Sequence, residues 1–151
     1  MNFSDTPLCN LCNVVGETPI HFFSQCSVTI NLWKDLTSFF YPAISLDPLT
    51  PRSALLGQFD NNDTSCIKNL ILLVFKYYLY KWRNENLNSL LFINQLKSIY
   101  YVEKSILSST AFDNKWGKIS HLMQWEEIIF DSYLNLPYFP IVTLVKNGNI
   151  A

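Results

Sequence analysis

Apolar side chains recur at three- and four-residue intervals in three long stretches of the chain, which is the spacing of helices buried along one face. The first stretch ends before Pro42, because proline cannot continue a helix. The second starts at a polar cap, Asp63 or Thr64, and reaches about Asn84, and the third begins near Asn88. The predicted buried faces are Leu32, Trp33, Leu36, Phe39 and Phe40 in the first, Ile67, Leu70, Ile71, Val74, Phe75, Tyr78 and Trp82 in the second, and Phe92, Leu96, Ile99, Val102 and Ile106 in the third.

The rest of the chain has weaker signals. A break at Ser108–Thr110 precedes a fourth predicted helix over Asp113–Leu134. Its apolar positions are Trp116, Ile119, Leu122 and Ile129. Prolines and a run of Asp and Asn predict a loop over residues 41–63, in which Ala54-Leu55-Leu56 is expected to enter the core. A β-like piece lies at Ile141–Val145.

Composition narrows the class of protein. Hydrophobic residues make up 49% of the chain and aromatic residues 15%, which excludes the composition of a disordered protein. The net charge of −1 gives no general attraction to nucleic acid or membrane, so any nucleic-acid surface must be a local patch. The apolar run Leu70–Phe75 is far shorter than the about 20 residues that span a bilayer. The first residues, MNFSDTPLC, show no secretory signal. We therefore expect an intracellular protein, nuclear or cytoplasmic, with no membrane partner and with reduced cysteines.

One group of residues has the spacing of metal ligands: Cys9-x2-Cys12-x8-His21-x4-Cys26. A Cys-x2-Cys pair presents two thiolates from one tight turn, and the His-x4-Cys pair can complete a tetrahedral zinc site. Four protein ligands leave no open position for water, so the predicted Zn²⁺ site is structural and not catalytic. Three thiolates and a neutral imidazole give the zinc centre a charge of about −1, which backbone N–H groups and nearby cations are expected to offset.

Two alternatives to a metal site stay open. The cysteines can be buried core residues beside an unrelated histidine, or Cys9 and Cys12 can be the redox pair of a thiol oxidoreductase, although no βαβ pattern surrounds them. Three of the four cysteines fall within 18 residues with His21 between them, which favours a metal. Cys66 lies outside the group and is interpreted as a small residue on a helix.

Together these patterns predict a mostly α-helical fold in which a small N-terminal zinc-binding module packs on a domain of three to four helices. The expected division is residues 1–40 for the module and its following helix, 41–63 for a loop, 64–136 for the helical region and 137–151 for a tail.

The stretch from Cys9 to Trp33 resembles the zinc-binding segment that follows the reverse transcriptase domain in non-LTR, LINE-type retrotransposon polyproteins. The residues that carry this pattern are Cys9, Cys12, Glu17, Thr18, His21, Phe22, Cys26 and Trp33. The similarity extends to about residue 118 through Leu55-Leu56-Gly57, the helix Ile67–Trp82, Glu103-Lys104 and Lys115-Trp116.

Several of these positions also have a local reason. Phe22 and Phe23 can seal one side of the metal, and Trp33 is expected to face back toward the metal module. Thr18 and Glu17 are expected to cap or hydrogen-bond near the His–Cys pair. Ordinary core packing accounts for the aromatic residues equally well.

The resemblance implies a noncatalytic domain that associates with RNA or DNA and works with the polymerase domain of the intact element. It also implies that Met1 follows the endonuclease and polymerase regions, so that this chain is a C-terminal part of such an element.

Enzyme signatures are missing from the sequence. No aromatic-x-Asp-Asp motif for two-metal polymerase chemistry occurs, and neither does a phosphate loop, a nucleophile elbow or an HExxH motif. Asp60 and Asp63 lie in an Asn-rich loop, Glu126-Glu127 have no acidic partner, and His121 stands alone on a helix. We therefore expect no enzymatic activity in this chain.

Four cations are candidates for a nucleic-acid surface: Lys76 and Arg83 on the second predicted helix, and Lys97 and Lys104 on the third. A seven-residue spacing places the members of each pair about 20° apart around a helix. Among them lie Tyr77, Tyr80 and Tyr101. Cations between stackable rings suit single-stranded RNA or DNA. A solvated helix face accounts for the pattern as well, so a protein-interaction module with a purely structural zinc site remains an alternative.

Overall fold

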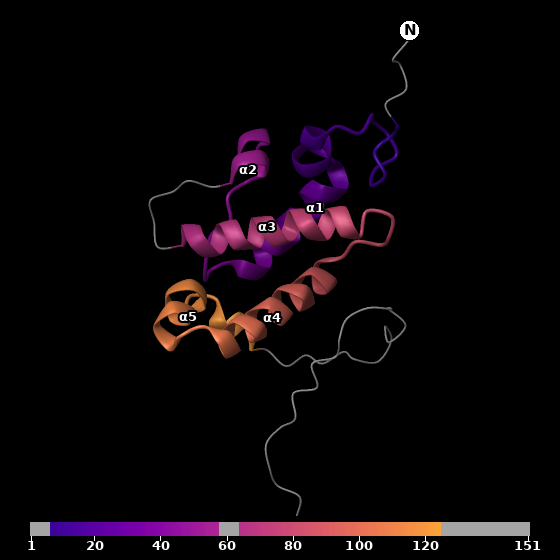
Figure 1. Cartoon of the computed structure of the whole chain (residues 1–151). Helices are drawn as coiled ribbons and strands as arrows, with labels where there is room; N and C mark the ends of the chain where they lie inside the picture. The colour runs from indigo at the N-terminus through magenta and orange to yellow at the C-terminus, as the bar shows by residue number, and fades with distance from the viewer. Residues whose placement is uncertain (1–6, 58–63, 125–151) are drawn as a thin grey trace, which may run out of the picture.

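The computed structural model describes residues 7–57 and 64–124, which form a mostly α-helical structure. In chain order the helices are the π-helical turn η1 (His21–Gln25), α1 (Ser27–Phe40), α2 (Pro51–Leu56), α3 (Ser65–Lys81), α4 (Ser89–Ile106), α5 (Ser109–Trp116) and α6 (Ser120–Met123). Figure 1 shows α3 across the middle of the molecule, with α1 behind it, α2 above it and α4 running obliquely below it. The predicted helical fold is confirmed, and the N-terminal Cys/His segment packs against the helices.

The long helices begin and end close to the predicted residues. α1 stops at Phe40, two residues before Pro42. α4 starts after Asn88, whose side-chain oxygen accepts a hydrogen bond from the Leu91 N–H at 2.8 Å. α3 starts after Thr64 and ends at Lys81, earlier than the predicted Asn84. Within the described ranges, no helix is long and apolar enough to cross a membrane.

Aromatic rings from α1, α3 and α4 make the centre of the core. The ring centroid of Trp33 lies 4.9 Å from that of Phe75. The Phe92 ring lies 5.9 Å from Phe75 and 5.7 Å from Tyr78, in edge-to-face contacts. Full burial of such a side chain stabilises the fold by roughly 1.5–3 kcal/mol. Through these contacts the Phe75 ring of α3 joins α1 to α4.

The segment predicted as a loop contributes more to the core than expected, and through different residues. Ile44 and Leu46 are each 3% exposed. Ala54 of α2 is buried, but Leu55 and Leu56 are 48% and 64% exposed. The prediction that all three residues of Ala54-Leu55-Leu56 enter the core is therefore wrong for the two leucines. A six-residue helix turns only a narrow face inward, so neighbours along the sequence point to solvent.

Asp47 in the same segment joins α1 to α3. Its backbone carbonyl accepts a hydrogen bond from Trp33 Nε1 at 2.9 Å. Its carboxylate lies 3.3 Å from the ammonium group of Lys68, a buried residue of α3. The pairing satisfies a charge that would be costly to bury alone.

The buried face of α4 differs from the prediction in its second half. Phe92, Leu96 and Tyr100 are fully buried, whereas Val102 and Ile106 are 53% and 71% exposed. Successive helical residues are about 100° apart, so each four-residue step from Phe92 to Leu96 and Tyr100 moves the buried face by about 40°, away from Val102. The predicted stripe combined three- and four-residue steps, which follow a helical face rotated from the buried one, and it omitted Tyr100.

In the part of the predicted fourth helix that the structure describes, there are two short helices. Ser108 caps α5 by accepting a hydrogen bond from the Ala111 N–H at 3.3 Å, so this helix starts before the predicted Asp113. It ends at Trp116, and a turn over 117–119 separates it from α6. The remainder of the predicted helix, with Ile129, and the predicted β-like piece of the tail lie outside the described residues.

Candidate metal centre

A tight turn near the start of the described chain presents Cys9 and Cys12. Leu8 and Gly16 form an antiparallel bridge that closes the segment. The N–H of Asn13 donates to the carbonyl of Cys9 at 2.8 Å. Asn13 has a φ of 55°, a left-handed conformation that asparagine adopts more readily than most residues. The chain thereby reverses within a few residues and places both cysteines at one end of the turn.

The π-helical turn η1 brings the other two ligands together. The N–H of Cys26 donates to the carbonyl of His21 at 2.7 Å, five residues back. In an α-helix, residues five apart point about 140° away from each other. A turn closed over five residues instead stacks the first above the last. The hydroxyl of Thr29 donates to the carbonyl of Phe22 at 2.8 Å and fixes this turn to α1.

The structure places all four predicted ligands in one cluster. Their ligand atoms lie within 4.8 Å of one another. Cys9 Sγ is 4.0 Å from Cys26 Sγ, and Cys12 Sγ is 3.3 Å from His21 Nε2. Bonds of about 2.3 Å to sulfur and about 2.1 Å to nitrogen put tetrahedral ligand atoms roughly 3.6–3.8 Å apart. The measured separations lie on both sides of that range, so this donor set can hold one metal ion.

The surroundings of the cluster change the acidity of two of its thiols in opposite directions. Hydrogen bonds from the backbone N–H groups of Val14 and Val15 lower the pKa of Cys12 from 9.0 to about 6. Burial raises the pKa of Cys26, although the N–H groups of Thr29 and Val28 act against it. Both sets of N–H groups can offset the negative charge of metal-bound thiolates, as the sequence led us to expect.

Residues around the ligands hold the histidine and the cysteine turn in place. Thr18 Oγ1 accepts a hydrogen bond from the His21 N–H at 3.1 Å, so the predicted hydrogen bond near the His–Cys pair is confirmed. Glu17 Oε2 instead accepts one from the N–H of Asn10 at 3.1 Å, so it bonds between the first two cysteines and not near the His–Cys pair as expected. Phe22 is buried in the same apolar core as Cys9 and Cys26.

Trp33 was expected to face back toward the metal module, but its contacts are with other parts of the fold. Its ring packs on Phe75 of α3, and its Nε1 donates to Asp47. It therefore belongs to the contact between α1 and α3.

The four candidate nucleic-acid cations do not form two matching helical pairs. Arg83 lies beyond the end of α3, and its Nη2 is 3.4 Å from Glu17 Oε1. In the orientation that satisfies both groups, Asn10 Oδ1 accepts hydrogen bonds from Arg83 Nη2 at 2.7 Å and from Nε at 3.0 Å. Arg83 thus joins the cysteine turn to the end of α3, a role that no local pattern in the sequence indicated.

The other three cations remain on the two long helices. Lys76 lies half-buried on α3, and Lys97 lies half-buried on α4. Lys104 is exposed, with its Nζ 5.9 Å from the ring centroid of Tyr100. The rings of Tyr77, Tyr80 and Tyr101 on the same two helices are 54%, 63% and 42% exposed.

Two residues singled out by their chemistry lie outside the cluster. Cys66 is exposed on α3, and His121 is exposed on α6. Within the described parts of the chain, Cys9, Cys12, His21 and Cys26 make up the group of His, Cys, Asp and Glu side chains that can surround a metal ion.

Comparison with known proteins gives no relative: no family model, no curated protein and no solved structure matches the chain. What the site can do chemically therefore rests on its own geometry.

Proposed function

We propose that this chain is a noncatalytic domain stabilised by one structural zinc ion at Cys9, Cys12, His21 and Cys26. The observation that carries this proposal is the convergence of four ligand atoms within 4.8 Å. Three sulfurs and one imidazole form a donor set typical of structural zinc, and four protein ligands leave no position for a substrate. The bound ion would link the cysteine turn to the start of α1.

Metal analysis tests the zinc proposal. Protein purified under reducing conditions should contain close to one equivalent of zinc by mass spectrometry. The variants Cys12→Ser and His21→Ala should lose it, because each removes one of four ligands. Cys66→Ser is the matched control, since this cysteine is exposed on α3 and should leave the zinc content unchanged. Folded wild-type protein without bound metal, or a variant that keeps its zinc, would contradict the proposal.

We further propose that the domain associates with single-stranded RNA or DNA as part of a LINE-type reverse transcriptase. The support is the resemblance of the segment from Cys9 to Trp33 to the zinc-binding region of that family. The exposed tyrosines of α3 and α4 add to it, because rings beside cations suit unpaired bases. Lys76, Lys97 and Lys104 are the cations in question, while Arg83 already binds Glu17.

Salt-dependent binding tests this second part. A labelled single-stranded RNA should bind the zinc-loaded protein at low salt, with a log–log slope of about −0.7 per neutralised phosphate. Replacing Lys76 and Lys104 by Ala should weaken binding to all sequences alike and flatten the slope, because phosphate contacts carry no sequence information. Lys34→Ala, which removes an exposed cation from α1, is the control. No retention of RNA or DNA by folded, zinc-loaded protein would contradict nucleic-acid association and leave the zinc proposal standing.

A further inference from the structure

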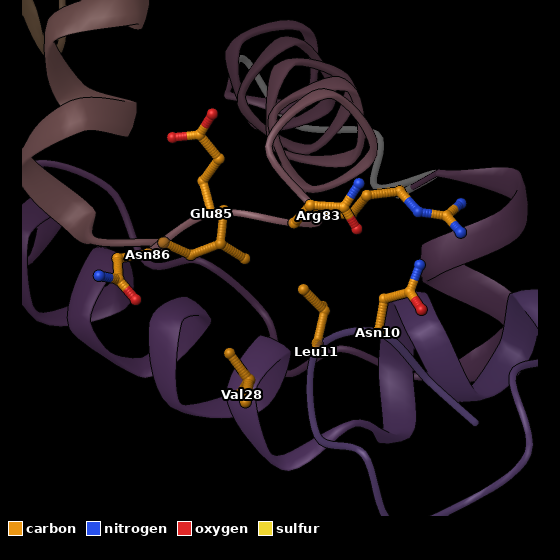
Figure 2. A pocket seen from close by; sticks show the side chains of 8 residues that line it. Asn10, Leu11, Val28, Arg83, Glu85 and Asn86 are labelled. Carbon is orange, nitrogen blue, oxygen red and sulfur yellow. The ribbon is translucent and has the colours of Figure 1, made fainter.

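An open cleft of about 570 Å³ lies where the metal module meets the turn between α3 and α4. Figure 2 shows Leu11 and Val28 on one side and the segment from Arg83 to Asn86 on the other. Its apolar part is formed by Leu11, Val28 and Leu87, which also pack against the core. The volume falls in the range of about 300–1,000 Å³ that is usual for ligand pockets.

The polar part of the cleft consists mainly of carboxamides. Asn10, Asn84 and Asn86 all line it. A carboxamide can donate and accept hydrogen bonds at once, which matches the alternating N–H and C=O groups of a peptide backbone. Asn84 and Asn86 have no side-chain hydrogen bond to another residue in the described ranges, so both can pair with a ligand.

The charges at the cleft disfavour a phosphate. Arg83 is the cation that lines it, and its guanidinium already binds Glu17 and Asn10. Glu85 places a carboxylate at the rim, with no ion-pair partner in the described part of the chain. A phosphate would meet this negative charge without a free cation, whereas a lysine or arginine side chain would be attracted to it.

We propose that this cleft binds an extended peptide that carries a large apolar residue followed by a basic one. The apolar side chain enters between Leu11, Val28 and Leu87, and the basic side chain reaches Glu85. The flanking peptide groups pair with the carboxamides of Asn84 and Asn86. This peptide site does not depend on nucleic-acid association, since it uses none of the three lysines assigned to that role.

Two residues that line the cleft lie close in sequence to the metal ligands. Leu11 lies between Cys9 and Cys12, and Val28 follows Cys26 by two residues. A metal ion that fixes these ligands also fixes the spacing of the apolar walls. Peptide binding should therefore require zinc-loaded protein.

A titration followed by NMR tests the proposal on the isotope-labelled, zinc-loaded full chain. The probe is a blocked tetrapeptide, acetyl-Gly-Leu-Lys-Gly-amide, at millimolar concentration. It should shift the methyl resonances of Leu11 and Val28 and the side-chain amides of Asn84 and Asn86. Replacing the probe's leucine by alanine should weaken binding at least about tenfold, because apolar burial is lost. Replacing its lysine by glutamate should weaken it about two- to fivefold.

Glu85→Gln should abolish the preference for lysine over glutamate in the probe and leave the zinc content unchanged. Asp35→Asn is the matched control, because it removes an exposed carboxylate of α1 and should keep the preference. The proposal is overturned if the cleft resonances do not move, or if they move equally for all three probes. Stronger perturbation of the same residues by an octameric oligouridylate would also overturn it, in favour of a nucleic-acid site.

Discussion

Cys12 and Cys26 belong to one ligand cluster but differ in what their surroundings do to the thiol. Backbone N–H groups point at the sulfur of Cys12 and stabilise its thiolate. Cys26 is fully buried, and burial favours its neutral form. At neutral pH Cys12 is therefore mostly a thiolate before a metal binds, while the Cys26 thiol must lose its proton when a metal binds.

Alkylation of metal-free protein should show this difference. At pH 7, iodoacetamide should modify Cys12 faster than Cys26, because a pKa of about 6 leaves Cys12 mostly ionised. As the pH falls through 6, Cys12 gains a proton and its own rate of alkylation should fall. Peptide mapping by mass spectrometry measures both rates, in a Cys66→Ser background that removes the thiol outside the cluster. Equal rates at pH 7, or a faster Cys26, would contradict the prediction.

At the scale of elements, Glu103 joins α4 to α5. One carboxylate oxygen lies 2.8 Å from Lys115 Nζ, and the other accepts a hydrogen bond from Trp116 Nε1 at 2.7 Å. Trp116 is fully buried, and its ring lies 5.3 Å from Tyr100. The pairs Glu103-Lys104 and Lys115-Trp116, which belong to the resemblance in this region, are therefore in contact. This contact gives a physical reason for the presence of both pairs in this fold.

Substitutions of Glu103 should separate its two contacts. Glu103→Ala leaves the buried Trp116 N–H without an acceptor, which should cost about 1–3 kcal/mol of unfolding free energy. Lys115→Ala removes only a partly exposed ion pair and should cost about 0.2–1 kcal/mol. Glu103→Gln keeps an acceptor oxygen and should resemble Lys115→Ala. Urea unfolding followed by tryptophan fluorescence measures all three, and equal losses for the alanine variants would contradict this account.

The sequence predicted elements well where one strong local signal acts. Asn88 marked the start of α4, and Pro42 marked the end of α1. It predicted poorly where the outcome depends on packing between elements. Val102 and Ile106 look like core residues but lie on the exposed side of α4. Residue spacing was enough for the four ligands, yet the π-helical turn that joins His21 to Cys26 has no signature of its own in the sequence.

Across the whole molecule, the metal cluster and the helices share one core. The buried cysteines Cys9 and Cys26 belong to the same apolar cluster as Phe75 in α3 and Met123 near the other end of the described chain. The two parts are nonetheless stabilised differently. The helices have their own aromatic contacts, whereas the cysteine turn contains few buried apolar side chains.

Removal of the metal should therefore affect the two parts unequally. With a chelator present, amides of residues 8–26 should exchange faster, because this segment opens more often, while Ile71 in α3 and Leu96 in α4 keep their protection from hydrogen exchange. Restoring zinc should restore protection, which controls for irreversible damage. A uniform loss over all helices would show instead that the core folds only with the metal, and no loss anywhere would contradict the structural role of the site.

The wide turn between His21 and Cys26 also limits how this chain can change over generations. Gln25 is exposed within it, so many replacements there should be harmless. Gain of one codon anywhere from Phe22 to Gln25 is a different event, because an extra residue would rotate the cysteine by roughly 100° in helical geometry and carry it away from the imidazole. Between His21 and Cys26, the number of residues should therefore be conserved more strictly than their identity.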